Sequence, residues 1–413
     1  MLALIAGLAA PTGAPAGALA QDEPPPIDLV PFTSATFGIT GVLPAGWDEA
    51  SPGLYARRST AEDLTAIVQW ALPGVTADQL AAALLPSFGL EALPEAVGEY
   101  ESALVTWDLY TFPVEASEPP LTVDLALAET DPATFVILLQ VGPDDHERLH
   151  EAVFLPALDA LDVLRWGPDL DSAFAADADA AVPTLALEVV ETRPHDPTAF
   201  TQGLLWHDGR VFESTGRYGE STVREVDAET GAVLRSAPVP EVYFAEGLER
   251  VGERLIQLTW KEQVAFVYDL ATFEQVGEFS YQGEGWGLCY DGVYLYMSNG
   301  SPIITIRDPE TFEIAYQGRV TYQGTPVQQL NELECVGDYI YANVWTSDSI
   351  VQIDKRDGRV VAVIDASGLL TPEEAEAADV LNGIAYDAEA GTFLITGKRW
   401  PKLFEVRFVA REE

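Results

Sequence analysis

Two stretches of the chain read alike: Glu246-Gly-Leu-Glu-Arg-Val-Gly-Glu-Arg-Leu-Ile-Gln-Leu-Thr-Trp260 and Trp286-Gly-Leu-Cys-Tyr-Asp-Gly-Val-Tyr-Leu-Tyr-Met-Ser-Asn-Gly300. Three further stretches fall into the same register and begin at Gln202, Asn331 and Asn382. The first residues of successive copies lie 44, 40, 45 and 51 positions apart. A repeat of about 40–50 residues made of short strands is typical of a β-propeller. Five copies therefore predict an all-β propeller with five blades.

The ends of the repeat predict how this propeller closes. Each full copy shows four strands, whereas the last copy reaches only a third strand, at 402–408. Residues 185–192 are predicted to supply the missing fourth strand, because closing the ring with strands from both ends removes exposed sheet edges. The propeller domain is therefore predicted over 183–410.

Two positions in each copy change from blade to blade while the frame around them repeats. One opens the innermost strand, which lines the central channel of a propeller, and the other ends the second strand. Variation within a repeating frame indicates function rather than packing. The opening residues are Gln202, Glu246, Trp286, Asn331 and Asn382, and the closing residues are Gly216, Trp260, Gly300, Trp345 and Lys398.

These ten positions supply one carboxylate, one ammonium, three amides and three tryptophans. One carboxylate without histidine offers too few ligands for zinc, so the ring predicts neither a metal nor a cofactor. What remains is an aromatic pocket with fixed hydrogen-bonding groups. Glu246 beside tryptophans predicts a raised pKa, which suits proton transfer near neutrality. On composition alone, an equal alternative is that Glu246 caps a blade while the tryptophans fill the channel.

Seven ordered motifs resemble the plant and bacterial glutaminyl cyclases, also called the glutamine cyclotransferase or glutaminyl-peptide cyclotransferase family. They are His195-Asp-Pro-Thr-Ala-Phe-Thr-Gln-Gly-Leu204, Glu213-Ser-Thr-Gly-Arg-Tyr-Gly219, Gly283-Glu-Gly-Trp-Gly287, Leu330-Asn-Glu-Leu-Glu334, Ala342-Asn-Val-Trp345, Val380-Leu-Asn-Gly-Ile384 and Thr396-Gly-Lys-Arg-Trp-Pro401. The resemblance covers 183–408. It implies a five-bladed, metal-independent enzyme that converts the N-terminal glutamine of peptides or proteins to pyroglutamate and releases ammonia.

The resemblance also implies roles for residues that the repeat selects. Glu246 is expected to act as the acid and base, and Lys398 and Asn331 are expected to contact the reacting amide. The substrate-binding residues are expected to be Phe200, Gln202, Trp260, Trp286, Trp345 and Asn382. The alternative is a non-catalytic propeller that binds peptide N-termini, and release of ammonia from a short peptide that begins with glutamine discriminates the two.

A first domain of unassigned role is predicted over 28–166, as a small α+β domain with an antiparallel sheet. Its motif at 37–47 and its closing helix resemble PsbP-like or Mog1-like extracytoplasmic domains, a resemblance that names no site residue. The expected strands are 65–70, 103–112, 121–127 and 134–140, and the expected helices are 77–85 and about 144–164.

One motif in this domain suggests a different chemistry. His146-Glu147-Arg148-Leu149-His150 matches the HExxH pattern of zinc peptidases, in which two histidines on one helix face bind the metal. Charged neighbours indicate a solvated face, no third ligand follows at a familiar spacing, and Pro156 shortens the segment. Short motifs match by accident, so the segment is predicted to be inert.

Composition and the N-terminal residues predict the compartment. The formal net charge of −44 argues against nucleic acid and anionic membranes as partners. Residues 1–20 are typical of a secretory signal, followed by a polar spacer at 21–27. Nothing later is apolar over a length that spans a bilayer, so the protein is predicted to be a secreted or periplasmic monomer.

Two features between and within the domains complete the prediction. Residues 167–182 are rich in alanine and aspartate and are predicted to be the linker. Cys289 and Cys335 lie at similar places in adjacent blades, where they form a disulfide or remain two buried thiols.

Overall fold

The computed structural model describes residues 26–60, 63–114, 117–173 and 181–411. They form two compact units, and the boundary falls between Leu164 and Arg165. The predicted signal, residues 21–25 of the predicted spacer and residues 174–180 of the predicted linker lie outside the described residues. Within the described ranges, no helix combines the length and the apolar character that crossing a bilayer requires.

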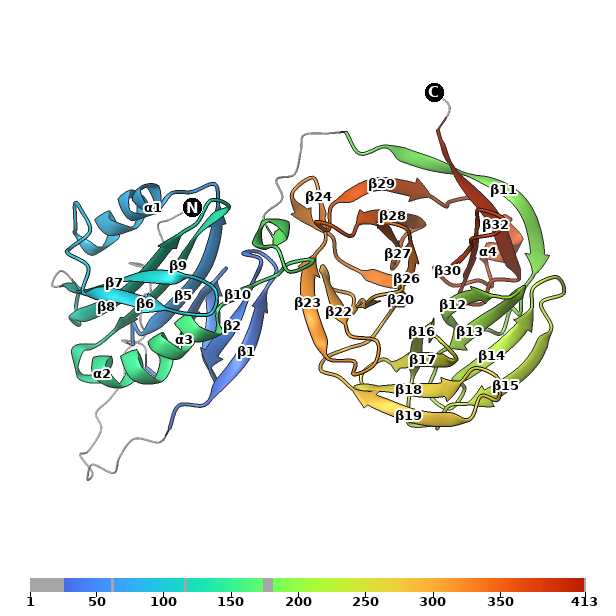
Figure 1. Ribbon diagram of the computed structural model, residues 1–413, viewed down its shortest axis with the longest axis horizontal. Helices are drawn as coiled ribbons and strands as arrows, with labels where there is room; N and C mark the ends of the chain where they lie inside the picture. Colours follow the sequence, from blue (N-terminus) through green and yellow to red (C-terminus); the bar gives the residue numbers. More distant parts are fainter. Residues whose placement is uncertain (1–25, 61–62, 115–116, 174–180, 412–413) are drawn as a thin grey trace. The chain divides into compact units, whose positions relative to one another are not determined.

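The first unit is built on an antiparallel sheet of seven strands in the order β3-β4-β5-β9-β8-β7-β6 (Figure 1). Its longer strands β5, β7, β8 and β9 coincide with the four strands predicted from the sequence, whereas the short strands β3, β4 and β6 were not predicted. A second, three-stranded sheet has the order β1-β2-β10. The strands are β1 (Leu29–Ser34), β2 (Ile39–Pro44), β3 (Asp48–Ser51), β4 (Leu54–Ala56), β5 (Ala66–Pro73), β6 (Gly98–Glu101), β7 (Thr106–Val114), β8 (Leu121–Glu129), β9 (Ala133–Val141) and β10 (Asp162–Val163).

Helices lie on both sides of the seven-stranded sheet (Figure 1). α1 (Ala77–Leu84) begins at a Thr76 capping box and packs Leu80 and Leu84 against one face. The segment predicted as one helix over about 144–164 is instead divided. Its parts are η2 (Pro143–Asp145), α2 (His146–Leu149), a π-helical turn η3 (His150–Phe154) and α3 (Leu155–Ala160). Pro156 cannot donate a backbone hydrogen bond, and the wider turn precedes it.

The second unit contains three four-stranded antiparallel sheets that follow one another along the chain. The unit also contains a two-stranded hairpin, formed by β24 (Thr321–Tyr322) and β25 (Thr325–Pro326). A short helix, η4 (Leu170–Ala173), precedes its first strand, and another, α4 (Pro372–Ala375), lies later in the chain. The strands of the three sheets are β12 (Thr201–His207), β13 (Arg210–Thr215), β14 (Thr222–Asp227), β15 (Val233–Pro238), β16 (Ala245–Val251), β17 (Arg254–Thr259), β18 (Val264–Asp269), β19 (Gln275–Ser280), β20 (Leu288–Tyr290), β21 (Leu295–Met297), β22 (Ile303–Arg307) and β23 (Ile314–Arg319).

The remaining strands of the second unit form one sheet of eight. Its order is β26-β27-β28-β29-β11-β32-β31-β30, so it joins the N-terminal strand of the unit to its last strands. The strands are β26 (Leu330–Val336), β27 (Tyr339–Val344), β28 (Ser349–Asp354), β29 (Val360–Asp365), β11 (Thr184–Pro194), β32 (Lys402–Ala410), β31 (Thr392–Gly397) and β30 (Leu381–Asp387).

The strand β11 closes the ring of sheets. It pairs antiparallel with β32 from Leu185 to Pro194, and parallel with β29 over three residues. The segment 185–192, expected to pair with the last strand, lies within β11. Because β32 and β29 both hydrogen bond to β11, neither presents its full outer edge to solvent.

The first strands of the sheets lie close together around the centre (Figure 1). β12, β16, β20, β26 and β30 each contact the next, and β30 contacts β12. The second residue of the repeat explains this approach: a Cβ added to Gly247 would lie 2.7 Å from the Trp286 carbonyl oxygen, and one added to Gly287 would lie 2.1 Å from that of Asn331. The repeated glycine is therefore a packing requirement.

Two further contacts tie the second unit together. Trp166, placed at the end of the first domain by the sequence, is buried within the second unit, and its indole donates a hydrogen bond to the Arg319 carbonyl at 3.2 Å. Cys289 in β20 and Cys335 in β26 form a disulfide with an S–S distance of 2.04 Å. Of the two alternatives for the cysteines, the structure has the bond.

We expect the ring to depend on β11 for stability. A chain shortened to begin at Arg165 keeps β11 and Trp166 and should unfold in one cooperative thermal transition, followed by circular dichroism. A chain that begins at His195 exposes the edges of β32 and β29, and it should melt at a much lower temperature or aggregate. A chain that begins at Pro183 keeps β11 but loses Trp166, a change that should cost about 3–5 kcal/mol. Equal melting temperatures for all three shortened chains would show that β11 does not contribute to the stability of the ring.

Candidate active site

A cavity of about 280 Å³ lies at one end of the ring of first strands. It gathers eight of the nine residues that the sequence selected as a site. The lining residues are Phe200, Gln202, Phe244, Glu246, Trp260, Trp286, Asn331, Trp345, Asp379 and Lys398. The ninth predicted residue, Asn382, lies behind this lining and contacts Gln202.

Hairpin geometry explains why these residues meet. In an antiparallel hairpin, the start of the first strand lies beside the end of the second. Ala245, which precedes Glu246, pairs with Thr259, which precedes Trp260. The blades that contain Asn331 and Asn382 pair in the same way, so both variable positions of the repeat project from one end of the ring.

The residues that open four of the five copies lie at irregularities in their strands. The pairing register shifts between Ala245 and Leu248 around Glu246, and corresponding shifts surround Gln202, Asn331 and Asn382. A β-bulge leaves a residue out of the regular ladder and re-aims its side chain. In a regular strand, successive side chains alternate between the two faces of the sheet. The bulges interrupt this alternation and redirect these polar side chains.

The two glycines among the predicted ring positions make room for neighbouring aromatic rings. A Cβ on Gly216 would lie 2.4 Å from the Phe244 ring, and a Cβ on Gly300 would lie 2.7 Å from the Trp286 ring. These positions carry no polar group themselves. Their function is to let the aromatic wall fill the cavity mouth.

The wall consists of two groups of rings. Phe244 packs edge-on against Phe200 and Trp260, with centroid distances of 6.3 Å and 5.7 Å. Trp286 and Trp345 form a second edge-to-face pair at 5.6 Å. Rings in these arrangements attract one another beyond their burial, so the walls are mutually supported.

Glu246 is the buried acid of the cavity, with only 5% of its surface exposed. Gln202 Nε2 donates a hydrogen bond to Glu246 Oε1 at 3.1 Å, and Asn382 Nδ2 donates to Gln202 Oε1 at 3.3 Å and to the Thr201 carbonyl at 3.0 Å. Asn382 therefore orients Gln202, which in turn holds the carboxyl group.

Burial raises the pKa of Glu246 well above its ordinary value, because the carboxylate loses water. Lys398 opposes this shift, while the negative charges of Glu284 and Glu262 add to it. Burial likewise lowers the pKa of the Lys398 ammonium, and Glu246 partly restores it. The site thus holds an acid and an amine whose pKa values are both displaced toward neutrality.

Asn331 brings an unpaired polar atom to the cavity. Its side chain is 3% exposed, and its Oδ1 has no hydrogen-bond partner among the described residues. A buried polar atom without a partner costs free energy. A ligand in the cavity that offers an N–H group would remove this cost.

Three residues of the site were missed by the sequence analysis. Phe244 and Glu284 lie two positions before Glu246 and Trp286, as Phe200 lies two before Gln202, so the repeat offered a signal for both. Glu284 Oε2 accepts hydrogen bonds from the indoles of Trp260 and Trp286 at 2.7 and 3.0 Å. Asp379 lies in the loop before β30, where nothing in the repeat marks it.

A buried charged network holds the segment that leads to Phe200. His195 Nε2 lies 3.1 Å from Glu213 Oε1, and Arg224 bonds both Glu213 and Asp196 at 2.7 and 2.9 Å. Burial alone would raise the pKa of Glu213, but His195 and Arg224 outweigh it and lower that pKa to about 2. The histidine is therefore a structural partner that fixes the loop from which Phe200 reaches the cavity.

The fold and the pocket define a propeller-like protein whose cavity holds a buried carboxyl group, an amine and aromatic rings. Residues 169–408 match the model of the glutamine cyclotransferase family. A glutaminyl-peptide cyclotransferase of Arabidopsis thaliana is 42% identical over 226 residues, which are 54% of this chain and 71% of that protein. The chain belongs to the glutamine cyclotransferase family.

A solved structure agrees with this assignment. The glutaminyl cyclase of Myxococcus xanthus is 39% identical and superposes with a TM-score of 0.52, covering 56% of this chain and all of that one. The family match begins at residue 169. It does not reach 28–166, whose resemblance to PsbP-like or Mog1-like domains stays a prediction.

The charges around Glu246 should move its pKa in opposite directions. Lys398→Met removes the positive charge that holds this pKa down, so the pKa should rise further. Glu284→Gln removes a negative charge that pushes it up, so the pKa should fall. Carboxyl carbon-13 NMR titration, with Glu246→Gln to assign the resonance, measures both. The exposed Glu229→Gln is the control and should leave the resonance unmoved. Shifts of the same sign in both variants would refute this electrostatic account.

Proposed function

We propose that the protein is a glutaminyl-peptide cyclotransferase, which converts the N-terminal glutamine of peptides or proteins to pyroglutamate and releases ammonia. The observation that carries the proposal is the buried Glu246, held by Gln202 and faced by Lys398 in an aromatic cavity. Membership of the glutamine cyclotransferase family supports it.

The size of the cavity suits one terminal residue. Its volume of about 280 Å³ is just below that of pockets that hold whole small molecules, about 300–1,000 Å³. Trp345, 38% exposed, lies at the rim. A substrate would place its first residue among the rings and leave the rest of the peptide outside, which allows many different sequences to follow the glutamine.

The reaction needs no nucleophile from the protein. The substrate's α-amine attacks its own side-chain amide carbon, a C–N bond closes a five-membered lactam, and the former amide nitrogen leaves as ammonia. The attacking amine must lose one proton, and the leaving nitrogen must gain one. The protein has to hold the folded-back conformer, stabilise the oxyanion and move this proton.

Glu246 suits the proton transfer. As a carboxylate it accepts a proton from the attacking amine, and as the acid it returns that proton to the departing nitrogen. Burial raises the pKa of Glu246 above its ordinary value, a direction that favours a general acid–base role, because catalysis is most effective when the pKa lies near the working pH. Activity should therefore fall as the pH drops through the pKa of Glu246, because the protonated acid cannot accept.

Lys398 and Asn331 are assigned to the substrate amide. The Lys398 ammonium is the positive charge opposite Glu246 and suits the developing oxyanion, while the unpaired Asn331 Oδ1 suits an N–H of the amine or amide. The tryptophans exclude water, whose attack on the amide would give glutamate instead of the lactam.

The architecture and setting follow the same proposal. We interpret the eight-stranded sheet as two blades, β26–β29 and β30–β32 with β11, which makes a five-bladed propeller. The Cys289–Cys335 disulfide supports a secreted or periplasmic location, where disulfides persist. Because residues of one chain line the whole cavity, the enzyme is proposed to act as a monomer.

Glu246→Gln tests the acid–base assignment. The variant keeps the shape and hydrogen bonding of the side chain but cannot accept a proton, so turnover should fall by about 10²–10⁴ with a smaller effect on KM. Trp345→Ala removes part of the wall and should chiefly raise KM. Ammonia release from a short peptide that begins with glutamine measures both.

The thermal midpoint distinguishes a catalytic from a structural Glu246. A catalytic residue leaves the midpoint of Glu246→Gln close to that of the parent. A variant that melts like the parent and cyclises within a few-fold of its rate would remove Glu246 from the mechanism. A parent protein that binds such peptides and releases no ammonia would be a binding module.

The cyclisation is proposed to be metal-independent. The cavity lining has two carboxylates, Glu246 and Asp379, and no histidine or cysteine, a donor set that suits zinc poorly. We expect turnover to be unchanged after dialysis against a strong chelator and after addition of zinc. Loss of turnover with the chelator, restored by zinc, would contradict this.

A further inference from the structure

The first unit contains three clustered side chains that the proposed cyclisation does not use. Asp124 lies in the middle of β8, His146 begins α2 and His150 begins η3. Asp124 Oδ2 is 2.9 Å from His146 Nε2 and 2.9 Å from His150 Nδ1. One carboxylate oxygen and two imidazole nitrogens thus lie within 4.8 Å of one another.

Strand alternation explains the position of Asp124. Val123 and Leu125, its neighbours in β8, pack with α1 on one face of the sheet. Asp124 therefore points to the opposite face, where it is paired across the ladder with Leu139 of β9, the strand that η3 contacts. The helical segment buries Leu149 and Phe154, which turns both histidines toward the buried carboxylate.

The third potential ligand, Asp124, therefore precedes the HExxH motif in the chain. No third ligand follows the motif at a familiar spacing. Asp124 lies 22 residues before His146 and 26 before His150. From the sequence, the charged neighbours predict a solvated face, and no third ligand is expected after the histidines. In the structure, that face instead covers a carboxylate whose side chain is fully buried.

Asp124 is oriented by a hydrogen bond on its other oxygen. Thr111, its cross-strand partner in β7, donates to Asp124 Oδ1 at 2.7 Å. Oδ2 is left for the two imidazoles, which converge on this single atom. Carboxylate ligands of metals are commonly held in this manner by an outer hydrogen bond.

The spacing suits a small divalent ion. A tetrahedral zinc site with bonds of about 2.0–2.2 Å separates its ligand atoms by about 3.3 Å. The two distances of 2.9 Å need to lengthen by only a few tenths of an ångström. The His146 and His150 side chains are 26% and 31% exposed, so the cluster is closed by the sheet and open toward solvent.

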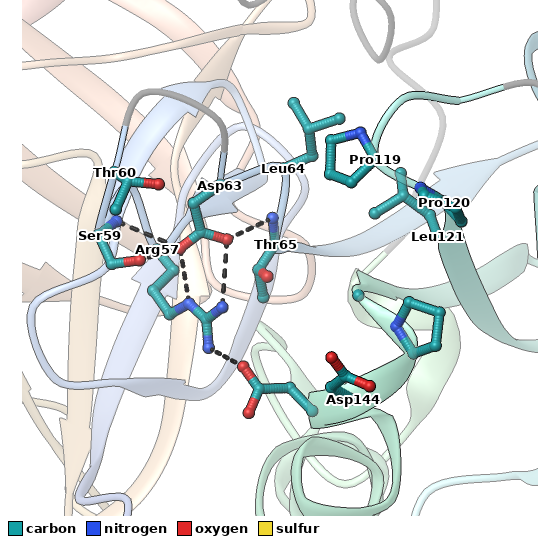
Figure 2. A pocket seen from close by; sticks show the side chains of 13 residues that line it. Arg57, Ser59, Thr60, Asp63, Leu64, Thr65, Pro119, Pro120, Leu121 and Asp144 are labelled. Atoms are coloured by element: carbon teal, nitrogen blue, oxygen red, sulfur yellow. Dashed lines mark hydrogen bonds and ion pairs between the residues drawn. The ribbon is translucent and has the colours of Figure 1, made fainter. Parts of the chain in front are cut away.

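The surroundings favour a cation. Asp144, Asp145, Glu147 and Glu151 flank the histidines within a chain of net charge −44, and the one arginine between the histidines, Arg148, lies 3.7 Å from Asp145. Arg57 does not neutralise the site, because its guanidinium is hydrogen bonded to Asp63 and Asp145 at 2.7 and 2.8 Å. Figure 2 shows Arg57 and Asp63 bonded beside a cavity of about 510 Å³ that Asp144 also lines. The bond from Arg57 to Asp145 fixes the turn that leads into α2.

We propose that Asp124 Oδ2, His146 Nε2 and His150 Nδ1 bind one divalent transition-metal ion of the zinc type, with a further coordination position open to water. Three protein ligands and an open position are the arrangement of accessible zinc sites. The proposal departs from the sequence-based prediction that the HExxH segment is inert. It concerns metal binding in the first unit and is independent of cyclisation in the second.

Zinc titration of the full chain tests the proposal. After removal of metals by a chelator, isothermal calorimetry should show one equivalent of zinc bound. His146→Ala and His150→Ala should each weaken binding by at least about 100-fold, and Thr111→Val, which frees the carboxylate to rotate, by about 10-fold or more. His207→Ala removes a part-exposed histidine of the second unit that also lies beside an aspartate, and should change nothing.

Cobalt provides a second readout that reports the ligands directly. Cobalt(II) in this site should show the intense visible absorption of a low-coordinate ion with nitrogen ligands, abolished in His146→Gln, a variant that keeps a polar side chain of similar size. Circular dichroism checks that each variant folds. Failure of the parent to bind zinc, a weak octahedral cobalt spectrum, or zinc affinity unchanged in both histidine variants would overturn the proposal. The cluster would then be a hydrogen-bonded carboxylate.

Discussion

The close approach of the first strands around the centre is the constraint on which the second unit depends. Gly203, Gly247 and Gly287 stand where a side chain would collide with the neighbouring strand, and Gly247 donates its N–H to the Trp286 carbonyl at 2.7 Å. In the fourth copy Glu332 takes the place of glycine, and its carboxylate accepts the N–H groups of Leu204 and Ile384. The strands are thus linked across the ring at the level of the repeat's second residue.

This linkage sets the chemistry at the end of the ring. Because the strands touch, the residues that precede each glycine converge, and aromatic side chains surround them. A carboxyl group placed there is deprived of solvent, which raises the pKa of Glu246 and lowers that of Lys398. The same packing that stabilises the ring therefore raises the pKa of the acid and lowers that of the amine, and the proposed reaction uses this pair without a metal ion.

Part of the site could be predicted from the sequence because equivalent positions of a repeat occupy equivalent places in the structure. Glu246, Trp345 and Lys398 were selected as variable places in a constant frame, and they line one cavity. Phe244 and Glu284 obey the same frame two residues earlier and were overlooked. Asp379 was beyond this reasoning, because its loop has no counterpart of equal length in the other copies. Hairpin pairing predicts which strand ends meet, but not the path of an irregular loop.

The sequence by itself determined the repeat, the strands that follow from it, the family and most of the cavity, because these depend on local periodicity and on spacing that recurs along the chain. Only the tertiary structure decided the bonding of Cys289 with Cys335, the burial of Trp166 in the second unit and the meeting of Asp124 with the HExxH histidines. The contacts of Trp166 and Asp124 join elements that no repeat relates, and the repeat placed the two cysteines in adjacent blades without deciding whether they bond. Strand order and helix packing bring such residues together, and a single sequence carries no periodic signal for that.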